Sequence, residues 1–228
     1  MEKDEASLIL SRLKANLLSP KVRLSVKDAF PTLIRTVLSQ HTNDKNTDRA
    51  FESLSKAFPI TPEALANAKD EDIGKAIKVA GLYRNKSRLI RKLAAQVLGQ
   101  FKGDLSSVLK SPLEEAREKL LGLPGVGPKT ADILLLFCGG KPTIPVDTHI
   151  FRFSKRLGLA SKDADYEAVR RSLQALFPEK EYLPIHFLLI SLGRSICIAR
   201  KPRCRTCFLN DVCPSSTYKP ETVERNDD

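Results

Sequence analysis

Hydrophobic residues recur at helical spacing through most of this 228-residue chain. Near the N-terminus, five leucines are expected to form one amphipathic stripe of a helix, namely Leu8, Leu10, Leu13, Leu17 and Leu18. No stretch shows the sustained alternation that is typical of a half-buried strand. We therefore predict an all-α fold, with further helices at residues 28–40, 44–58, 70–80, 86–101, 112–121, 129–138, 147–157, 164–176 and 182–194.

Two Pro-containing pairs add start signals to this pattern. Thr61-Pro62 and Ser111-Pro112 each place a capping residue before a proline that is suited to the first helical position. Ser111 is also followed three residues later by Glu114, which predicts a capping box. The polar residues 217–228 are expected to form a flexible tail.

The charge balance bears on the partner. Lysine and arginine number 38 against 27 acidic residues, and the formal net charge of +11 favours a polyanionic partner such as nucleic acid, although a basic surface also serves solubility. No apolar run approaches the ~18 residues that a membrane span needs, and acidic residues near the N-terminus do not fit a signal peptide. We expect a cytoplasmic protein that does not enter membranes.

Four of the five cysteines lie close together. Cys197, Cys204, Cys207 and Cys213 form the pattern C-x6-C-x2-C-x5-C, which suits a tetrahedral metal ion or a four-iron cluster, while unpaired cysteines are a third possibility. Zinc sites usually show two close cysteine pairs, and this segment has one. Basic side chains stand between the ligands and are expected to contact DNA phosphates, namely Arg200, Lys201 and Arg203.

A glycine-punctuated turn joins two of the predicted helices. Gly125 and Gly127 allow positive φ and a close backbone approach, so the turn is either an anion site built from backbone N–H groups or a plain helix–helix connection. We expect Gly125, Val126 and Gly127 to contact DNA.

Lys129 follows this turn at the expected start of a helix, and Asp147 lies at the expected start of the next. A lysine near a positive helix end and partly desolvated favours its neutral, nucleophilic form, which can attack C1′ of a nucleoside. Asp147 is expected to be an N-cap that assists this chemistry. A phosphate-contacting lysine and a purely structural cap are the alternatives.

Three stretches together resemble one family. LPGVGPKTAD, PTIPVDTHIFR and SICIARKPRCRTC match, in order and spacing, endonuclease III, a helix-hairpin-helix DNA glycosylase. The resemblance implies two helical lobes. Residues 25–141 would form a six-helix bundle with the hairpin, residues 1–24 plus 142–216 would form the cluster lobe, and residues 217–228 would follow as the tail.

The resemblance also implies an activity. Lys129 matches the Schiff-base lysine and Asp147 the essential aspartate, while the four cysteines would hold a [4Fe–4S] cluster. A monomeric, bifunctional glycosylase and AP lyase would then remove oxidised pyrimidines from duplex DNA and cut abasic sites by β-elimination, near the nucleoid of a prokaryotic cell. A mismatch glycosylase for uracil or thymine opposite guanine and a non-catalytic DNA-binding module are the competing hypotheses.

The resemblance extends to two further loops, and at some positions the chain differs from the usual residues of the family. Leu82 matches the apolar wedge that enters the duplex. The family often has LSAQATD where this chain has LSQHTND, so His41, or the neighbouring Gln40, would fill the gap left by a flipped base. Pro128 and Asp132 stand where arginine and asparagine are frequent in the family.

Overall fold

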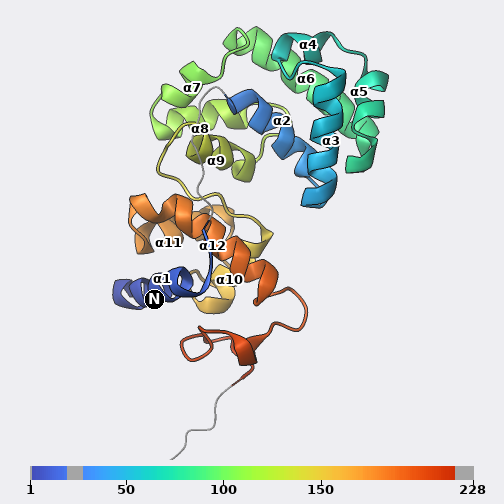
Figure 1. Cartoon of the computed structure of the whole chain (residues 1–228). Coiled ribbons are helices and arrows are strands. Elements are labelled where there is room, and N and C mark those ends of the chain that lie inside the picture. The colour runs from blue at the N-terminus through green and yellow to red at the C-terminus, as the bar shows by residue number, and fades with distance from the viewer. Residues whose placement is uncertain (1, 20–27, 219–228) are drawn as a thin grey trace, which may run out of the picture. The chain divides into compact units, whose positions relative to one another are not determined.

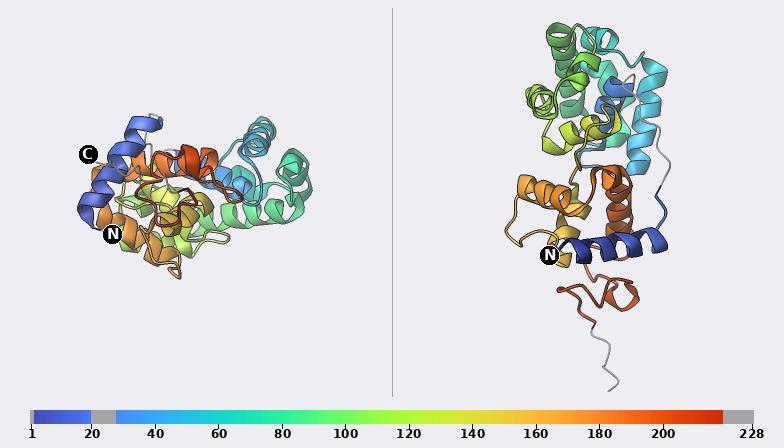
Figure 2. Two further views of the ribbon diagram at one scale, coloured as in Figure 1. Left: turned by 90° about the horizontal axis from the view of Figure 1, so that it is seen from below. Right: turned by 90° about the vertical axis from the view of Figure 1, so that its left-hand side faces the viewer.

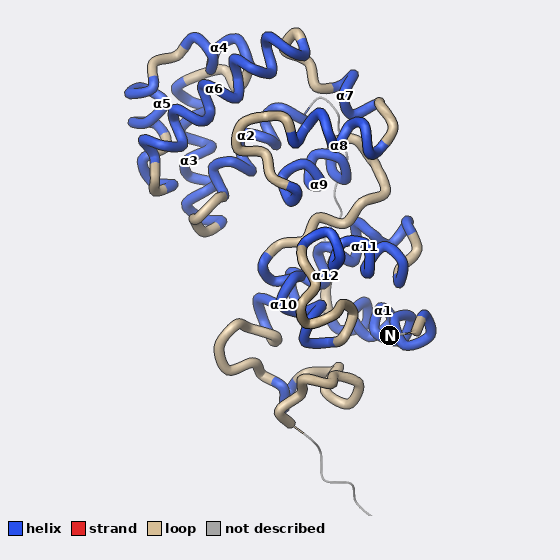
Figure 3. The backbone as a smooth tube through the Cα atoms, turned by 180° about the vertical axis from the view of Figure 1, so that it is seen from behind, coloured by secondary structure: helices blue, strands red, loops and turns tan. Residues whose placement is uncertain are grey.

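A computed structural model describes residues 2–19 and 28–218 of the chain, and this part consists of helices joined by loops (Figures 1 and 3). Within those ranges no residue belongs to a strand, which confirms the all-α prediction. The described helices include none with the length and apolar content to cross a membrane. Most of the predicted tail, from residue 219 onward, lies outside the described residues.

The chain divides into two compact units. One is a single stretch, Val22–Pro145, and the other combines Met1–Lys21 with Val146–Asp228. We call them the contiguous unit and the split unit.

The contiguous unit is a helical bundle around a continuous apolar core. The long helix α6 packs against α4 and α5, while α2 packs against α3 and α9 (Figure 1). Leu33, Ile34, Ile90, Leu93 and Leu134 are fully buried within this core. The helices are α2 (Ala29–Ser39), α3 (Asp44–Ala57), α4 (Pro62–Asn67), α5 (Asp70–Ala76), η2 (Lys78–Ala80), α6 (Tyr83–Phe101), α7 (Ser106–Lys110), α8 (Leu113–Leu121) and α9 (Pro128–Phe137).

The split unit joins the first helix of the chain to the last. The apolar side chains Ala6, Ile9 and Leu13 are fully buried on α1, which packs against α12 (Figure 2). The predicted leucine stripe was therefore wrong in part, because Leu8 and Leu18 are exposed. Lys14 Nζ lies 2.7 Å from a carboxylate oxygen of Glu181 beside the start of α12. The helices are α1 (Lys3–Asn16), α10 (Thr148–Leu157), α11 (Tyr166–Leu176), η3 (Glu179–Glu181), α12 (Tyr182–Ser195) and η4 (Cys204–Thr206).

Of the two helix starts predicted from a capping residue before a proline, one is confirmed and the other was wrong. Thr61 caps α4 by accepting a hydrogen bond from the Ala64 N–H, with Pro62 at the first helical position, as predicted. The capping box at Ser111 was wrong, because Ser111 ends α7 and Pro112 is the N-cap residue of α8. The Ser111 hydroxyl donates to the Ser107 carbonyl of α7 at 3.4 Å, and the N-cap residue of α8 has no side-chain capping hydrogen bond.

Candidate functional site

The turn between α8 and α9 closes on its own backbone. The Val126 N–H donates to the Leu123 carbonyl at 3.2 Å, and both of these apolar side chains are buried. Gly125 has a φ of +74°, and a Cβ there would lie 2.6 Å from Leu89 Cδ2, so any other residue would be strained in its backbone and would have to displace the Leu89 side chain. The prediction of positive φ and close approach is thus confirmed at Gly125. It was wrong at Gly127, which has a φ of −91° and where a Cβ would meet nothing within 4 Å.

Lys129 is the second residue of α9. Gly127 is the N-cap and Pro128 takes the first helical position, so the lysine stands at the positive end of the helix dipole as expected. The expected partial desolvation was wrong, because the Lys129 side chain is exposed. The turn buries Val126 and Leu123 instead.

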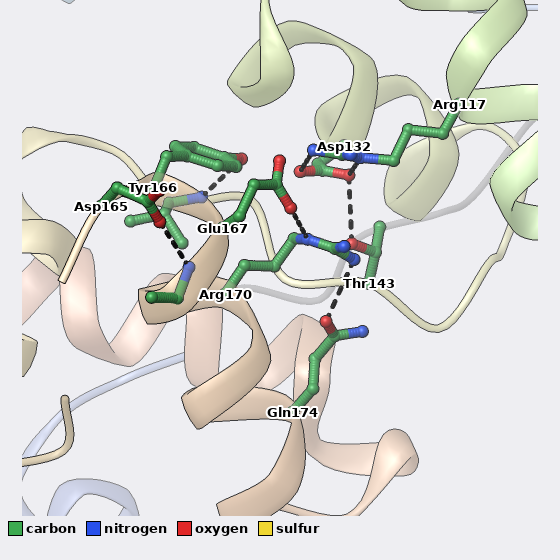
Figure 4. Close-up of polar contacts among 10 residues, drawn as sticks. Arg117, Asp132, Thr143, Asp165, Tyr166, Glu167, Arg170 and Gln174 are labelled. Carbon is green, nitrogen blue, oxygen red and sulfur yellow. Dashed lines mark hydrogen bonds and ion pairs between the residues drawn. The ribbon is translucent and has the colours of Figure 1, made fainter.

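A buried ion pair between Arg117 and Asp132 joins α8 to α9. Asp132 is fully buried and accepts hydrogen bonds from Arg117 Nε at 2.9 Å and Nη2 at 3.4 Å, and from Thr143 Oγ1 at 3.2 Å (Figure 4). Arg117 comes from α8 and Thr143 from the loop after α9. The aspartate that departs from the family pattern thus clamps the two helices of the hairpin together.

Asp147 caps α10 in the split unit, as predicted. Its carboxylate accepts a hydrogen bond from the Ile150 N–H at 2.7 Å, and the side chain is buried. The neighbouring Val146 N–H donates to the Tyr166 hydroxyl at 3.2 Å, while Asp165 caps α11 through the Ala168 N–H (Figure 4). On α11, Arg170 bonds to Glu167 and Gln174, which ties successive turns of that helix. The residues before Asp147 are therefore held in place from a second helix.

Two loops of the contiguous unit carry the other residues expected to contact DNA. Gln40 ends α2, and its side-chain amide donates to the Gly125 carbonyl at 3.2 Å, which ties this loop to the hairpin. His41 is exposed and has a φ of +55°. Leu82 precedes α6 with a φ of +47° and is 58% exposed, a rare combination for a leucine.

The cysteine segment brings its four thiols to one cavity. Cys197, Cys204, Cys207 and Cys213 all line it. Burial raises the pKa of the Cys207 and Cys213 thiols, whereas a hydrogen bond with Thr217 lowers the pKa of Cys204. Across the described residues, no three His, Cys, Asp or Glu side chains are arranged to hold a single metal ion. The four thiols therefore share one cavity.

Two arginines of α10 hold the start of this segment. Arg156 donates to the carbonyls of Ile198 at 2.8 Å and Ala199 at 2.9 Å, and its Nη1 lies 3.5 Å from Cys197 Sγ. Arg152 donates to the Cys197 carbonyl at 2.9 Å. Arg12 of α1 reaches the far end of the segment and bonds to Asp211 at 2.6 Å. The exposed side chains of the segment include the three expected to contact DNA, Arg200, Lys201 and Arg203.

A family model for the HhH-GPD superfamily of base excision DNA repair proteins matches residues 34–179. Endonuclease III of Thermotoga maritima is 40% identical over 186 residues, which cover 82% of this chain and 83% of the relative. The chain belongs to the HhH-GPD superfamily. This confirms the family resemblance and makes it a base excision DNA repair protein of endonuclease III type.

Other relatives in the HhH-GPD superfamily match almost the whole chain. Endonuclease III of Escherichia coli K12 is 36% identical over 215 residues, 93% of this chain and 96% of the relative. The structure of a trapped endonuclease III–DNA covalent intermediate aligns with a TM-score of 0.81 at 30% identity, covering 95% of this chain and 97% of that one. A thermostable thymine-DNA glycosylase aligns at a TM-score of 0.77 with 21% identity, which shows a shared fold alone.

Sequence reasoning missed several supporting residues of this HhH-GPD protein. Arg152 and Arg156 lie four residues apart on α10, so both face the cysteine segment, and that spacing was a usable signal. Arg117 and Lys86 carried no such signal, because a single charged residue in an amphipathic helix is usually solvent-exposed. Both are buried here.

Proposed function

We propose that this member of the glycosylase and AP-lyase class removes oxidised pyrimidines from duplex DNA and then cuts the strand 3′ to the abasic site by β-elimination. The observation that carries the proposal is the placement of Lys129 at the N-terminus of α9, directly after the hairpin turn. Backbone N–H groups at such a turn suit a DNA phosphate, and the amine then stands near the sugar attached to it.

The proposed chemistry begins with a neutral Lys129 amine. Its nitrogen bonds to C1′ as the bond from C1′ to the base breaks, and the base departs with the electron pair and gains a proton. The sugar ring opens to a Schiff base, which makes the 2′ hydrogen acidic. Loss of that proton forms the C2′–C3′ double bond and expels the 3′ phosphate, and water then hydrolyses the imine and frees the lysine.

We assign Asp147 to the same step. The carboxylate would accept the proton that the lysine gives up, or stabilise positive charge on the sugar as the base leaves. Its hydrogen bond to the Ile150 N–H supports this role, because an N-cap carboxylate is held in one orientation.

The two exposed loops would enter the duplex at the place from which the damaged base is extruded. Leu82 would enter the stack as an apolar wedge, which agrees with its 58% exposure. Of the two candidates for the filler, we favour His41, because Gln40 already donates its amide to the hairpin carbonyl of Gly125 while His41 is exposed.

The four cysteines fit a [4Fe–4S] cluster. Four thiols around one cavity are the donor set that such a cluster requires, and their spacing has only one of the two close cysteine pairs that are usual for zinc. Bound there, the cluster would supply a rigid staple for the basic loop with Arg200, Lys201 and Arg203, which we assign to DNA phosphates. We assign residues 1–24 plus 142–216 to this cluster lobe and residues 25–141 to the hairpin lobe.

Borohydride trapping tests the lyase chemistry. With a duplex that carries one oxidised thymine, the reductant should link the wild-type protein to DNA, and Lys129→Ala should abolish that product. Lys119→Ala is the matched control, since Lys119 is a lysine of the hairpin's other helix and is paired with Glu115 at the surface. Absence of trapping by the wild type, or equal trapping by Lys129→Ala, would refute the lyase role and favour the non-catalytic DNA-binding module.

A panel of duplexes, each with one lesion, tests the substrate class. We expect base release from oxidised pyrimidines. Release confined to uracil or thymine opposite guanine would replace this choice with the mismatch glycosylase. His41 is the residue whose substitution by glutamine should alter the preference for the opposite base.

A further inference from the structure

Lys86 is a buried lysine with a defined set of contacts. It lies in the first turns of α6 and only 4% of its surface is exposed. Lysine is almost never fully buried unless its ammonium has partners, because the charge loses its hydration. Burial lowers the pKa of Lys86, which agrees with a desolvated ammonium. Its position therefore calls for an explanation beyond helix formation, particularly since the N-terminal end of a helix disfavours a cation.

The ammonium bridges two backbone segments. Lys86 Nζ donates to the Leu38 carbonyl at 2.8 Å and to the Ala80 carbonyl at 3.0 Å. Leu38 lies in the last turn of α2, where carbonyl groups lack partners within the helix and attract a positive charge. Ala80 is the last residue of η2. One side chain thus satisfies the ends of two helical elements that are far apart in the sequence.

Each of these carbonyls stands just before one of the exposed loops. Gln40 and His41 follow Leu38, and Gly81 and Leu82 follow Ala80. Both loops contain a non-glycine residue in the left-handed region, with a φ of +55° at His41 and +47° at Leu82. Such conformations persist only where the surroundings impose them. The lysine supplies a constraint at the base of both loops at once.

We propose that Lys86 is a positioning residue that holds the His41 loop and the Leu82 loop at a fixed separation, so that both enter the duplex at the same base step. This inference rests on the proposed function, which assigns the filler and the wedge to these loops. Without the ammonium, two buried carbonyls would lose their donor, and the loops would move independently of each other.

Lys86→Met tests the inference, because it keeps the length and apolar stem of the side chain and removes the charge. Leu93→Ala is the matched control, since Leu93 is a fully buried core residue two turns further along α6. Single-turnover base release from an oxidised thymine in duplex DNA should fall by about tenfold or more in Lys86→Met. Cleavage of an abasic site in single-stranded DNA, which needs no wedge, should stay within about twofold of wild type.

A double variant adds a readout that loss of stability alone would not produce. Leu82→Ala should slow base release in the wild-type background and have little further effect in Lys86→Met, because the wedge would already be misplaced. Effects that multiply, or an equal fall on duplex and single-stranded DNA, would overturn the inference.

Amide hydrogen exchange in the free protein separates this inference from the proposed function. Lys86→Met should speed amide exchange at residues 38–42 and at residues 80–83. Leu93→Ala should not speed exchange selectively at these two loops. Unchanged exchange at either loop would overturn the inference even in an active enzyme. Absence of base release by the wild type would instead overturn the proposed function, whatever the exchange shows.

Discussion

The hairpin and the cysteine segment are both expected to contact DNA, yet they are built in different ways. The hairpin is closed by its own backbone, through the hydrogen bond from the Val126 N–H to the Leu123 carbonyl, and by a glycine packed against Leu89. The cysteine segment has one short helical turn, η4, and otherwise runs as loop (Figure 3). Its carbonyls are held by arginine side chains that come from α10.

The hairpin turn is held mainly by contacts within and beside it, whereas the cysteine segment is held by side chains from another helix. The hairpin turn closes a backbone hydrogen bond of its own and otherwise accepts from neutral side chains such as Gln40, so it keeps its geometry as long as its flanking helices and α2 stay packed. A loop whose carbonyls depend on distant guanidinium groups keeps its geometry only while those groups and its thiol ligands are in place. The hairpin should therefore respond to changes in packing, and the cysteine segment to changes in charge and in ligands.

The largest effect on stability is expected beneath the hairpin. Arg117→Met leaves the fully buried Asp132 carboxylate without its cation and should lower the free energy of unfolding by about 3–5 kcal/mol. Urea denaturation followed by circular dichroism measures the change. Arg91→Met is the control, since its pair with Asp70 is half-exposed and should contribute less than about 1 kcal/mol. Equal effects of both variants would show that the clamp does not stabilise the hairpin.

The next effect should be confined to the cysteine segment. Arg156→Met removes donors to the Ile198 and Ala199 carbonyls and the contact with Cys197 Sγ. Each such bond to a charged group contributes about 1.5–3 kcal/mol. We expect faster bleaching of the cluster absorbance near ~400 nm in a chelator, with little change in hairpin exchange. Bleaching at the wild-type rate would mean that the thiol ligands hold the segment unaided.

A smaller effect is expected at the turn itself. Gly125→Ala should cost about 1–3 kcal/mol, because the new methyl group meets Leu89 and the φ of +74° is unfavourable for alanine. Gly99→Ala is the control within α6, where a Cβ meets nothing within 4 Å and alanine should stabilise the helix by up to about 1 kcal/mol. Thermal unfolding distinguishes them, and a neutral Gly125→Ala would contradict the close fit of the turn.

The smallest effect depends on pH. The hydrogen bond from Arg12 lowers the pKa of Asp211, so the folded-state value lies below the unfolded one. The resulting stabilisation is present above the unfolded pKa, near about 4, and is lost as the pH falls through the lower folded value. We expect acid to loosen α1 from the cysteine segment only slightly, since both side chains are partly exposed. Asp211→Asn should abolish this pH dependence in exchange measurements, and its persistence would place the titrating group elsewhere.

Much of the helical pattern could be predicted from the sequence. Residues 44–58 and 182–194 were expected to be helical, and α3 and α12 occupy Asp44–Ala57 and Tyr182–Ser195. The short helix α7 was not predicted, because five residues are too few to establish a period. The capping box at Ser111 failed because capping depends on backbone direction as well as on residue type.

The site was predictable where chemistry is tied to a local turn. Lys129 and Asp147 both stand at helix starts, and their neighbours in the sequence indicated this. The exposure of Lys129 and the burial of Lys86 were not predictable, since each depends on which face of its helix meets the rest of the bundle. Hydrophobic periodicity predicts that a helix has a buried face. Tertiary packing decides which group each polar side chain contacts.

The pairing of α1 with α12 has a consequence for synthesis of the chain. The contiguous unit is complete once residue 145 has left the ribosome, so it can fold during translation. Helix α1 precedes this unit in the sequence, and its apolar face of Ala6, Ile9 and Leu13 gains its contacts with α12 only when that helix emerges. At roughly 5–20 residues per second that delay is on the order of ten seconds. During that time the apolar face of α1 is open to other hydrophobic partners.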